Sequence, residues 1–299
     1  MAPKHQRFVS GVPISVNQQP SAQQPFVHRS PLHDLNPPQI TTKAKILMRQ
    51  RQWEEAEKIL KDAIDAYPKN PFFYNMLVNV HCRSRRIADA RNVFDEAVML
   101  GIADVVTYNT MINAYGKAGK VADARELFDE TERKGIADVV MYNTMINAYG
   151  KAGEVADARE LFDEAVMLGI ANVMTYNTMI NAYKKAGEVA DAKELFDEAV
   201  KNGSANVVTY NTMINAYGKA GVVADARELF DEAVMLGIAN MVTYNSMIDA
   251  YYSKGMFIDI DGLIAGAPTN IRAELELLAK ENGGADISKH IQKALEQLG

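Results

Sequence analysis

Hydrophobic residues in the middle of the chain follow a helical spacing on two successive segments. In residues 105–115 the apolar side chains recur three or four positions apart, and residues 121–128 repeat that spacing. The first set is Tyr108, Met111, Ile112 and Tyr115, and the second set is Val121, Ala124, Leu127 and Phe128. Gly119 stands between them, where a left-handed residue ends a helix at little cost. The pattern predicts two antiparallel helices whose apolar stripes are packing surfaces.

The whole pattern repeats every 34 residues. Nearly identical copies occupy residues 105–138, 139–172, 173–206 and 207–240, and divergent copies lie at 37–70, at 71–104 and from 241 onward. A fixed period of this length is the sequence signature of a solenoid built from helical hairpins. We therefore predict an all-α, right-handed superhelical solenoid of about seven helix-turn-helix repeats with a C-terminal helical cap.

Proline placement divides the chain. Seven of the ten prolines lie in the first 38 residues, and none lies between Pro71 and Pro268, so a Pro-, Gln- and Ser-rich tail precedes helix-compatible sequence. We expect residues 1–36 to be a disordered tail, residues 37–270 to be the repeat array and residues 271–299 to be capping helices. Residues 1–33 carry basic residues and no acid, so a targeting role for the tail stays open beside plain disorder.

The central units share two strings of residues and a closing motif. The strings are Val-Val-Thr-Tyr-Asn-Thr-Met-Ile-Asn-Ala-Tyr-Gly-Lys-Ala-Gly at 105–119 and Ala-Arg-Glu-Leu-Phe-Asp-Glu at 124–130, and a unit closes on Gly-Ile-Ala followed by Asp or Asn. In these features the chain resembles the pentatricopeptide repeat family over about residues 71–255, although its unit is one residue shorter and lacks that family's usual proline near the end. Residues 37–70, which close on Tyr67 and Pro68, look closer to the tetratricopeptide repeat, a protein-binding relative.

The resemblance implies a protein that binds single-stranded RNA, one nucleotide per unit. In that family the fifth and last residues of a unit address one base, and the second residues of adjacent units hold its ring. The base-reading pairs would be Asn75 with Asp104, Asn109 with Asp138, Asn143 with Asn172, Asn177 with Asn206, and Asn211 with Asn240, followed by Asn245. The base-sandwiching residues would be Phe72, Val106, Val140, Met174, Val208 and Val242.

The resemblance also implies which base each pair prefers. A pair of Asn with Asp favours uracil, and a pair of Asn with Asn favours cytosine and, after it, uracil. With the N-terminus at the 5′ end, the predicted site is 5′-UU followed by three pyrimidines, preferably C.

The distribution of charge decides whether such a ligand is plausible. The net charge of −6 disfavours nucleic acid unless basic residues gather on one surface. The first fifteen residues of the units from 37 to 255 contain twelve basic residues and one acid, Asp249, because the other acids lie on the second helices. One basic residue per unit, near the end of the first helix, is predicted to contact phosphate: Arg83, Lys117, Lys151, Lys185 and Lys219. The alternative is that these residues only complement the helix dipole.

Two further alternatives stay open. Asn and Asp are good helix caps, so the residues at the unit ends could serve folding alone, and duplicated copies would repeat that choice. Asn in a first helical turn has poor helix propensity, which favours a role beyond folding.

The alternative function of the whole protein is a tetratricopeptide-like interaction scaffold or a ribonucleoprotein subunit. Units that carry the same polar residues at the same positions suit a ligand that is a polymer of near-identical monomers. This favours RNA over a peptide ligand.

No catalytic constellation is recognisable in the chain. The five histidines are scattered without metal-ligand spacing, and the lone cysteine, Cys82, is expected to be a small buried apolar residue. We expect a non-enzymatic protein without cofactors or a membrane span, acting by occupancy in RNA stability, processing or translation. Single-stranded RNA is the predicted partner, with other RNA-processing proteins and a homodimer left open. The expected localisation is a mitochondrion or plastid, and the alternative is a bacterial cytoplasm or a secreted effector.

Overall fold

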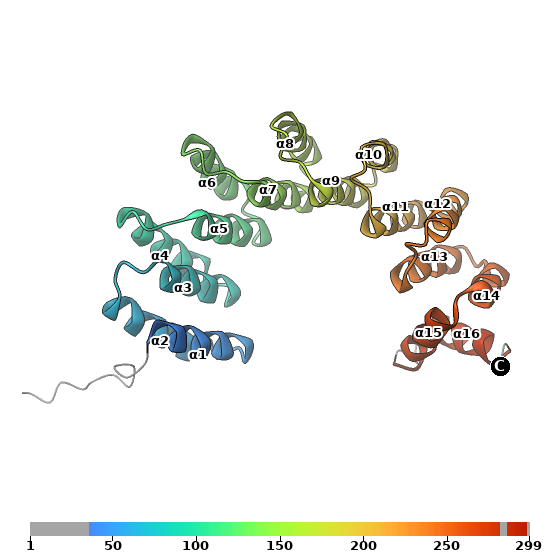
Figure 1. Cartoon of the computed structure of the whole chain (residues 1–299), viewed down its shortest axis with the longest axis horizontal. Helices are drawn as coiled ribbons and strands as arrows, with labels where there is room; N and C mark the ends of the chain where they lie inside the picture. The colour runs from blue at the N-terminus through green and yellow to red at the C-terminus, as the bar shows by residue number, and fades with distance from the viewer. Residues whose placement is uncertain (1–35, 282–285, 298–299) are drawn as a thin grey trace, which may run out of the picture.

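The computed structural model describes residues 36–281 and 286–297. These residues form sixteen α-helices and no strand (Figure 1), which confirms the predicted all-α solenoid. The disordered tail predicted for residues 1–36 lies outside the described residues, apart from Asn36, whose side chain caps the first helix.

The helices form pairs, one pair per unit. The first helices are α1 (Pro37–Arg49), α3 (Pro71–Arg83), α5 (Val105–Lys117), α7 (Val139–Ala152), α9 (Val173–Ala186), α11 (Val207–Ala220) and α13 (Met241–Ser253). The second helices are α2 (Trp53–Ala66), α4 (Ile87–Met99), α6 (Val121–Arg133), α8 (Val155–Met167), α10 (Val189–Lys201), α12 (Val223–Met235) and α14 (Phe257–Gly266). Helices α15 (Thr269–Glu281) and α16 (Asp286–Glu296) follow. In Figure 1 the pairs describe an arch in which α5, α7, α9, α11 and α13 lie on the inner side, and the second helices between them lie outside.

The predicted apolar stripes form the core. Tyr108, Met111 and Ile112 are at most 1% exposed. At each junction between central units a phenylalanine of the second helix meets the first-helix tyrosine of the next unit edge-on, with ring centroids 4.9–5.0 Å apart, a geometry that aromatic quadrupoles favour. The pairs are Phe94–Tyr108, Phe128–Tyr142, Phe162–Tyr176, Phe196–Tyr210 and Phe230–Tyr244. The same contact therefore joins each unit to the next from unit 71–104 to the unit that begins at Met241.

Glycines inside the first helices bring successive first helices close together. A Cβ at Gly150 would lie 2.6 Å from the Cβ of Ala182 in the next unit, and one at Gly116 would lie 2.7 Å from that of Ala148. A side chain at either position would force a shift of the facing helix, as must happen to accommodate Lys184, which occupies the same unit position at the next junction. The inner surface is therefore a wall of closely stacked first helices, on which residues at the same unit position form rows.

Candidate nucleic-acid interface

The second-place residues form a row of exposed apolar side chains. Val106, Val140, Met174, Val208 and Val242 are 50–61% exposed, and Phe72 is 42% exposed. Each lies in the first turn of its helix, because the unit-end residue immediately before the helix fixes where that turn begins. A single exposed valine on a soluble protein needs no explanation. Six apolar side chains left exposed at one unit position form a surface on which flat rings can rest.

The unit-end residues, Asp104, Asp138, Asn172, Asn206 and Asn240, are helix caps. The Asn206 Oδ1 accepts hydrogen bonds from the backbone N–H groups of Val208 (2.9 Å) and Thr209 (3.2 Å). Asn172 and Asn240 cap in the same manner, whereas Asp104 and Asp138 each accept from one backbone N–H, that of the third residue after them. The capping alternative raised by the sequence therefore describes a real structural role, and base reading would have to use the atoms that capping leaves over.

A residue that the sequence analysis missed completes most of these caps. The Thr209 Oγ1 accepts a hydrogen bond from the Asn206 backbone N–H at 2.9 Å, and threonines do the same after Asp104, Asn172 and Asn240. The unit that follows Asp138 has Met141 at this place and lacks the reciprocal bond. The signal was present in the sequence as a threonine three residues after the cap, the pattern of a capping box.

The fifth-place asparagines, Asn75, Asn109, Asn143, Asn177, Asn211 and Asn245, lie beside the unit-end residues. The structure brings the fifth and last residues into hydrogen-bonding distance in three of the five predicted pairs. The Nδ2–Oδ1 distances are 3.1 Å for Asn75 to Asp104, 3.5 Å for Asn177 to Asn206 and 3.3 Å for Asn211 to Asn240.

The other two predicted pairs are not joined by a hydrogen bond within the described residues. In one of them the Asn109 Oδ1 accepts from the Thr144 hydroxyl at 2.9 Å instead. In the other pair, no hydrogen bond joins Asn143 to Asn172. Asn75, Asn109, Asn177 and Asn211 thus form hydrogen bonds between units, and of these only Asn109 does so without bonding to its unit end.

Several amide atoms of the two rows have no protein partner. The Oδ1 atoms of Asn143, Asn177 and Asn211 are buried and accept no hydrogen bond in the described part of the chain. An unpaired buried acceptor costs about 1–3 kcal/mol, and because these oxygens are buried they are not themselves exposed to a ligand. The Nδ2 groups of Asn172, Asn206 and Asn240 likewise donate to nothing among the described residues, since their Oδ1 atoms do the capping.

The chemical identity of the unit-end residue therefore decides which polar group stays available. A unit-end Asn caps with its oxygen and leaves an N–H₂ donor, whereas a unit-end Asp leaves a second acceptor oxygen. Burial raises the pKa of Asp104, but hydrogen bonds from the Thr107 backbone and side chain and from Asn75 outweigh burial and lower the pKa overall. Asp104 is accordingly an ionised acceptor at neutral pH.

A row of unneutralised positive charges runs beside the amides. Arg83, Lys117, Lys151, Lys185 and Lys219 are exposed and form no ion pair within the described residues. By contrast, the second-helix arginines Arg91, Arg125, Arg159 and Arg227 are paired with an aspartate four residues on, as in Arg159–Asp163 at 2.8 Å. Burial and then the positive charges of Lys185 and Lys117 lower the pKa of Lys151, so lysines of three successive units are near enough to repel one another. A polyanion lying along the row would relieve that repulsion.

Other chemistry finds little support in the described residues. No group of three or more His, Cys, Asp or Glu side chains there is placed to hold a metal ion. No helix within residues 36–281 and 286–297 is long and apolar enough to cross a bilayer. Cys82 is half-buried rather than fully buried, and burial raises its pKa to about 12, so the thiol is unreactive at neutral pH.

Family models match most of the array. The PPR repeat family model matches residues 205–253, the PPR repeat model matches 101–130 and 134–166, and the pentatricopeptide repeat domain model matches 160–220. The chain belongs to the pentatricopeptide repeat family. A tetratricopeptide repeat model matches residues 41–104, so the tetratricopeptide-like region of this pentatricopeptide repeat protein includes unit 71–104 as well as the predicted unit 37–70.

Solved structures share the fold. PPR10 in complex with an 18-nt psaJ RNA element is 24% identical with a TM-score of 0.59, over 77% of this chain and 39% of that one. PPR10 from maize is 23% identical with a TM-score of 0.58, over 86% and 40%. A tetratricopeptide repeat protein from Parabacteroides merdae is 13% identical with a TM-score of 0.51, over 86% and 97%. The chain thus spans about two fifths of the length of PPR10. No curated protein matches it.

Proposed function

We propose that this pentatricopeptide repeat protein binds single-stranded, pyrimidine-rich RNA along the inner surface of its arch, reading about one base per unit. The observation that carries the proposal is the parallel course of three rows on the first helices: exposed apolar side chains, amides with unpaired atoms, and unneutralised basic residues. Each row offers what one part of a nucleotide needs, respectively the ring face, the base edge and the phosphate. The solved complex of PPR10 with RNA supports the same ligand class.

The atoms left over by capping suggest how the two pyrimidines are told apart. With Asp at the unit end, the fifth-place amide supplies a donor and the carboxylate an acceptor, which match the O4 and N3–H of uracil. With Asn at the unit end, two N–H₂ groups face the base, which match the adjacent O2 and N3 acceptors of cytosine. This agrees with the 5′-UU and C-rich order implied by the family resemblance. The proposed role is non-enzymatic occupancy of a transcript in a mitochondrion or plastid.

The test is a swap of base preference. Binding of U-, C-, A- and G-only oligomers to the full chain is measured at two salt concentrations, before and after the combined change Asn172→Asp, Asn206→Asp and Asn240→Asp. Preference should move from C toward U. The reciprocal variant Asp104→Asn, Asp138→Asn should move it toward C, and both variants keep a capping residue at every unit end. An unchanged ranking of the bases in both variants would remove base reading from this protein.

A protein-interaction scaffold is the second candidate, favoured by the tetratricopeptide match over residues 41–104. A scaffold should bind none of the four oligomers at either salt concentration. Pyrimidine binding that weakens with salt is therefore the outcome that separates the two candidates.

A further inference from the structure

A basic hollow lies at the N-terminal end of the row of amides, where units 37–70, 71–104 and 105–138 meet. It encloses about 1120 Å³, and its lining includes Arg49, Arg51, Arg83, Arg85 and Lys117 but no acidic side chain. We call this site the arginine hollow. The later units carry only one or two basic residues each at the corresponding end of the first helix, so positive charge is concentrated here beyond the general row.

The charges of the arginine hollow are not used by the fold. All five basic side chains are exposed, and none forms an ion pair within the described residues. Within the same pair of units, Arg86 is bonded to Glu57 and Arg91 to Asp95. Five like charges left without a counter-charge repel one another, which favours occupation of the hollow by an anion.

The backbone carries a second sign of function. Arg51 and Arg85 have φ values of 59° and 63° and are the only non-glycine residues with positive φ in the described part of the chain. The central units have glycine at the same place, for example Gly119 and Gly153. A side chain is strained in this conformation whereas glycine is not. Retaining arginine at a position where glycine serves the other units indicates a use for the guanidinium.

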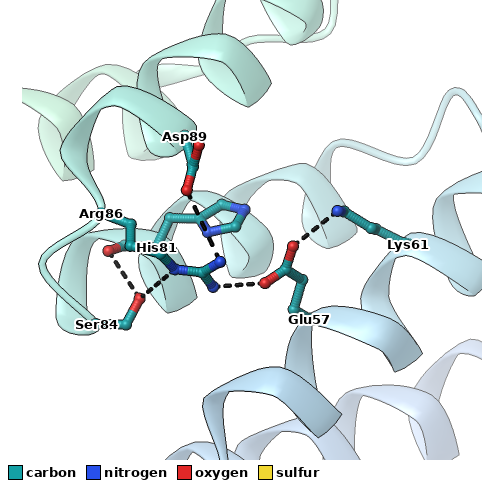
Figure 2. Close-up of polar contacts among 6 residues, drawn as sticks. All are labelled: Glu57, Lys61, His81, Ser84, Arg86 and Asp89. Carbon is teal, nitrogen blue, oxygen red and sulfur yellow. Dashed lines mark hydrogen bonds and ion pairs between the residues drawn. The ribbon is translucent and has the colours of Figure 1, made fainter.

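Ser84 and Arg86, the neighbours of Arg85 in the chain, take part in a network of hydrogen bonds (Figure 2). The Arg86 guanidinium donates to the Glu57 carboxylate at 2.5 Å and to the Ser84 hydroxyl at 3.2 Å. The Ser84 hydroxyl in turn donates to the backbone carbonyl of His81 at 3.1 Å. Across the hollow, the Arg83 guanidinium lies 5.7 Å from the centroid of the Trp53 ring, a distance suited to a cation–π contact. The backbone that carries Arg85 and the side chain of Arg83 are thus pre-positioned, which reduces the entropy lost on binding.

The hollow lies where a bound strand would end. Unit 37–70 has Thr41 at the fifth place, so the row of fifth-place asparagines begins with Asn75, and Asn109 itself lines the hollow. Unit 37–70 therefore reads no base but contributes Arg49 and Arg51. We propose that the arginine hollow binds the terminal phosphate of the RNA strand. A terminal monoester carries about −1.5 to −2 charges and three acceptor oxygens, which paired guanidinium forks match better than the single charge of an internal diester does.

This inference rests on the proposed function, whose polarity places the 5′ end here. The test uses the full chain and a labelled UUCCC reference strand displaced by unlabelled UUCCC that carries a 5′-hydroxyl, a 5′-phosphate or a 3′-phosphate. The 5′-phosphate should compete about 5- to 20-fold better than the 5′-hydroxyl, as charge-assisted hydrogen bonds in a partly exposed site do. Ten adenosines added between the phosphate and UUCCC should abolish the advantage.

The matched variants are Arg51→Gly with Arg85→Gly, and Lys58→Gln with Lys201→Gln. The first pair introduces the glycine that later units use and so preserves the turns. The second removes the same charge from exposed sites on α2 and α10. Only the arginine variant should lose the phosphate advantage.

Three outcomes would overturn parts of the proposal. Equal competition by the 5′-hydroxyl and both phosphorylated strands, or a full phosphate advantage in the arginine variant, overturns the terminal-phosphate site alone. An advantage for the 3′-phosphate instead reverses the assigned polarity. Failure of every strand to bind overturns the proposed function, and this site with it.

Discussion

Replacing Asn172, Asn206 and Asn240 together by serine should separate helix capping from base reading. Serine caps a helix about as well as asparagine does, whereas alanine does not cap. Neither serine nor alanine carries a side-chain amide. The serine variant should therefore keep its stability and lose the choice between C and U, and the alanine variant should lose stability as well as that choice.

The expected loss of stability follows from the cap geometry. At each site Oδ1 accepts two backbone N–H groups, with distances of 2.9–3.2 Å. Removing one such cap costs about 1 kcal/mol. The three sites are in separate units, so the alanine variant should lose about 3 kcal/mol if the effects add. The serine variant should lie within about 1 kcal/mol of the parent protein.

Urea unfolding followed by circular dichroism measures the stability, and competition between oligo-C and oligo-U measures the reading. The capping argument is refuted if serine destabilises the protein as much as alanine does. The reading argument is refuted if the serine variant still prefers C over U by the same ratio as the parent protein. Because the two readouts are independent, either part can fail without the other.

Three further predictions concern packing, pH and salt. Gly150→Ala should destabilise the chain by about 1–3 kcal/mol, since its Cβ would lie 2.6 Å from that of Ala182. Burial raises the pKa of Glu57, but hydrogen bonds from Lys61 and Arg86 lower it overall from 4.5 to about 2. The ionised carboxylate therefore contributes stability to the fold above pH 4.5, and this contribution is lost as the pH falls toward 2. The stability difference between the parent and Glu57→Gln should therefore shrink over that range. Replacing four lysines by glutamine should reduce the salt slope of RNA binding by about 3; they are Lys117, Lys151, Lys185 and Lys219.

Each of these has a matched control. Gly262 lies in a helix with nothing within 4 Å of an added Cβ, so Gly262→Ala should stabilise the protein by about 0.5–1 kcal/mol; a loss there equal to that of Gly150→Ala would contradict the packing argument. A parent-minus-variant difference that stays constant from pH 4.5 to pH 2 would contradict the lowered pKa of Glu57. The charge variant Lys58→Gln with Lys201→Gln removes two charges and should leave the salt slope unchanged; a reduction of about 1.4, in proportion to those charges, would mean that overall charge, not the lysine row, sets the slope.

Much of the fold could be predicted from the sequence because its determinants are local. The apolar spacing predicted a first helix over 105–115 and a second helix with Val121, Ala124, Leu127 and Phe128 on its buried face, and the structure has α5 at Val105–Lys117 and α6 at Val121–Arg133. The polar residue before each first helix was recognised as a possible cap from its type and place alone. Such features depend on residues a few positions apart, so one copy of the unit contains them.

The site depends on relations between units, which a single copy does not contain. Asn75 and Asp104 meet although 29 residues separate them, and Arg49, Arg83 and Lys117 line one hollow from three units. These meetings depend on how far each hairpin is displaced and turned against the next.

The sequence by itself determined the repeat, its helices, its caps and the residue types available at each unit position. Only the tertiary structure decided which of those residues face one another. The physical reason is that the offset between hairpins is set by the close approach of Gly150 to Ala182 and by edge-on ring pairs such as Phe128–Tyr142. Such contacts are formed when hairpins stack, and no single helix encodes them.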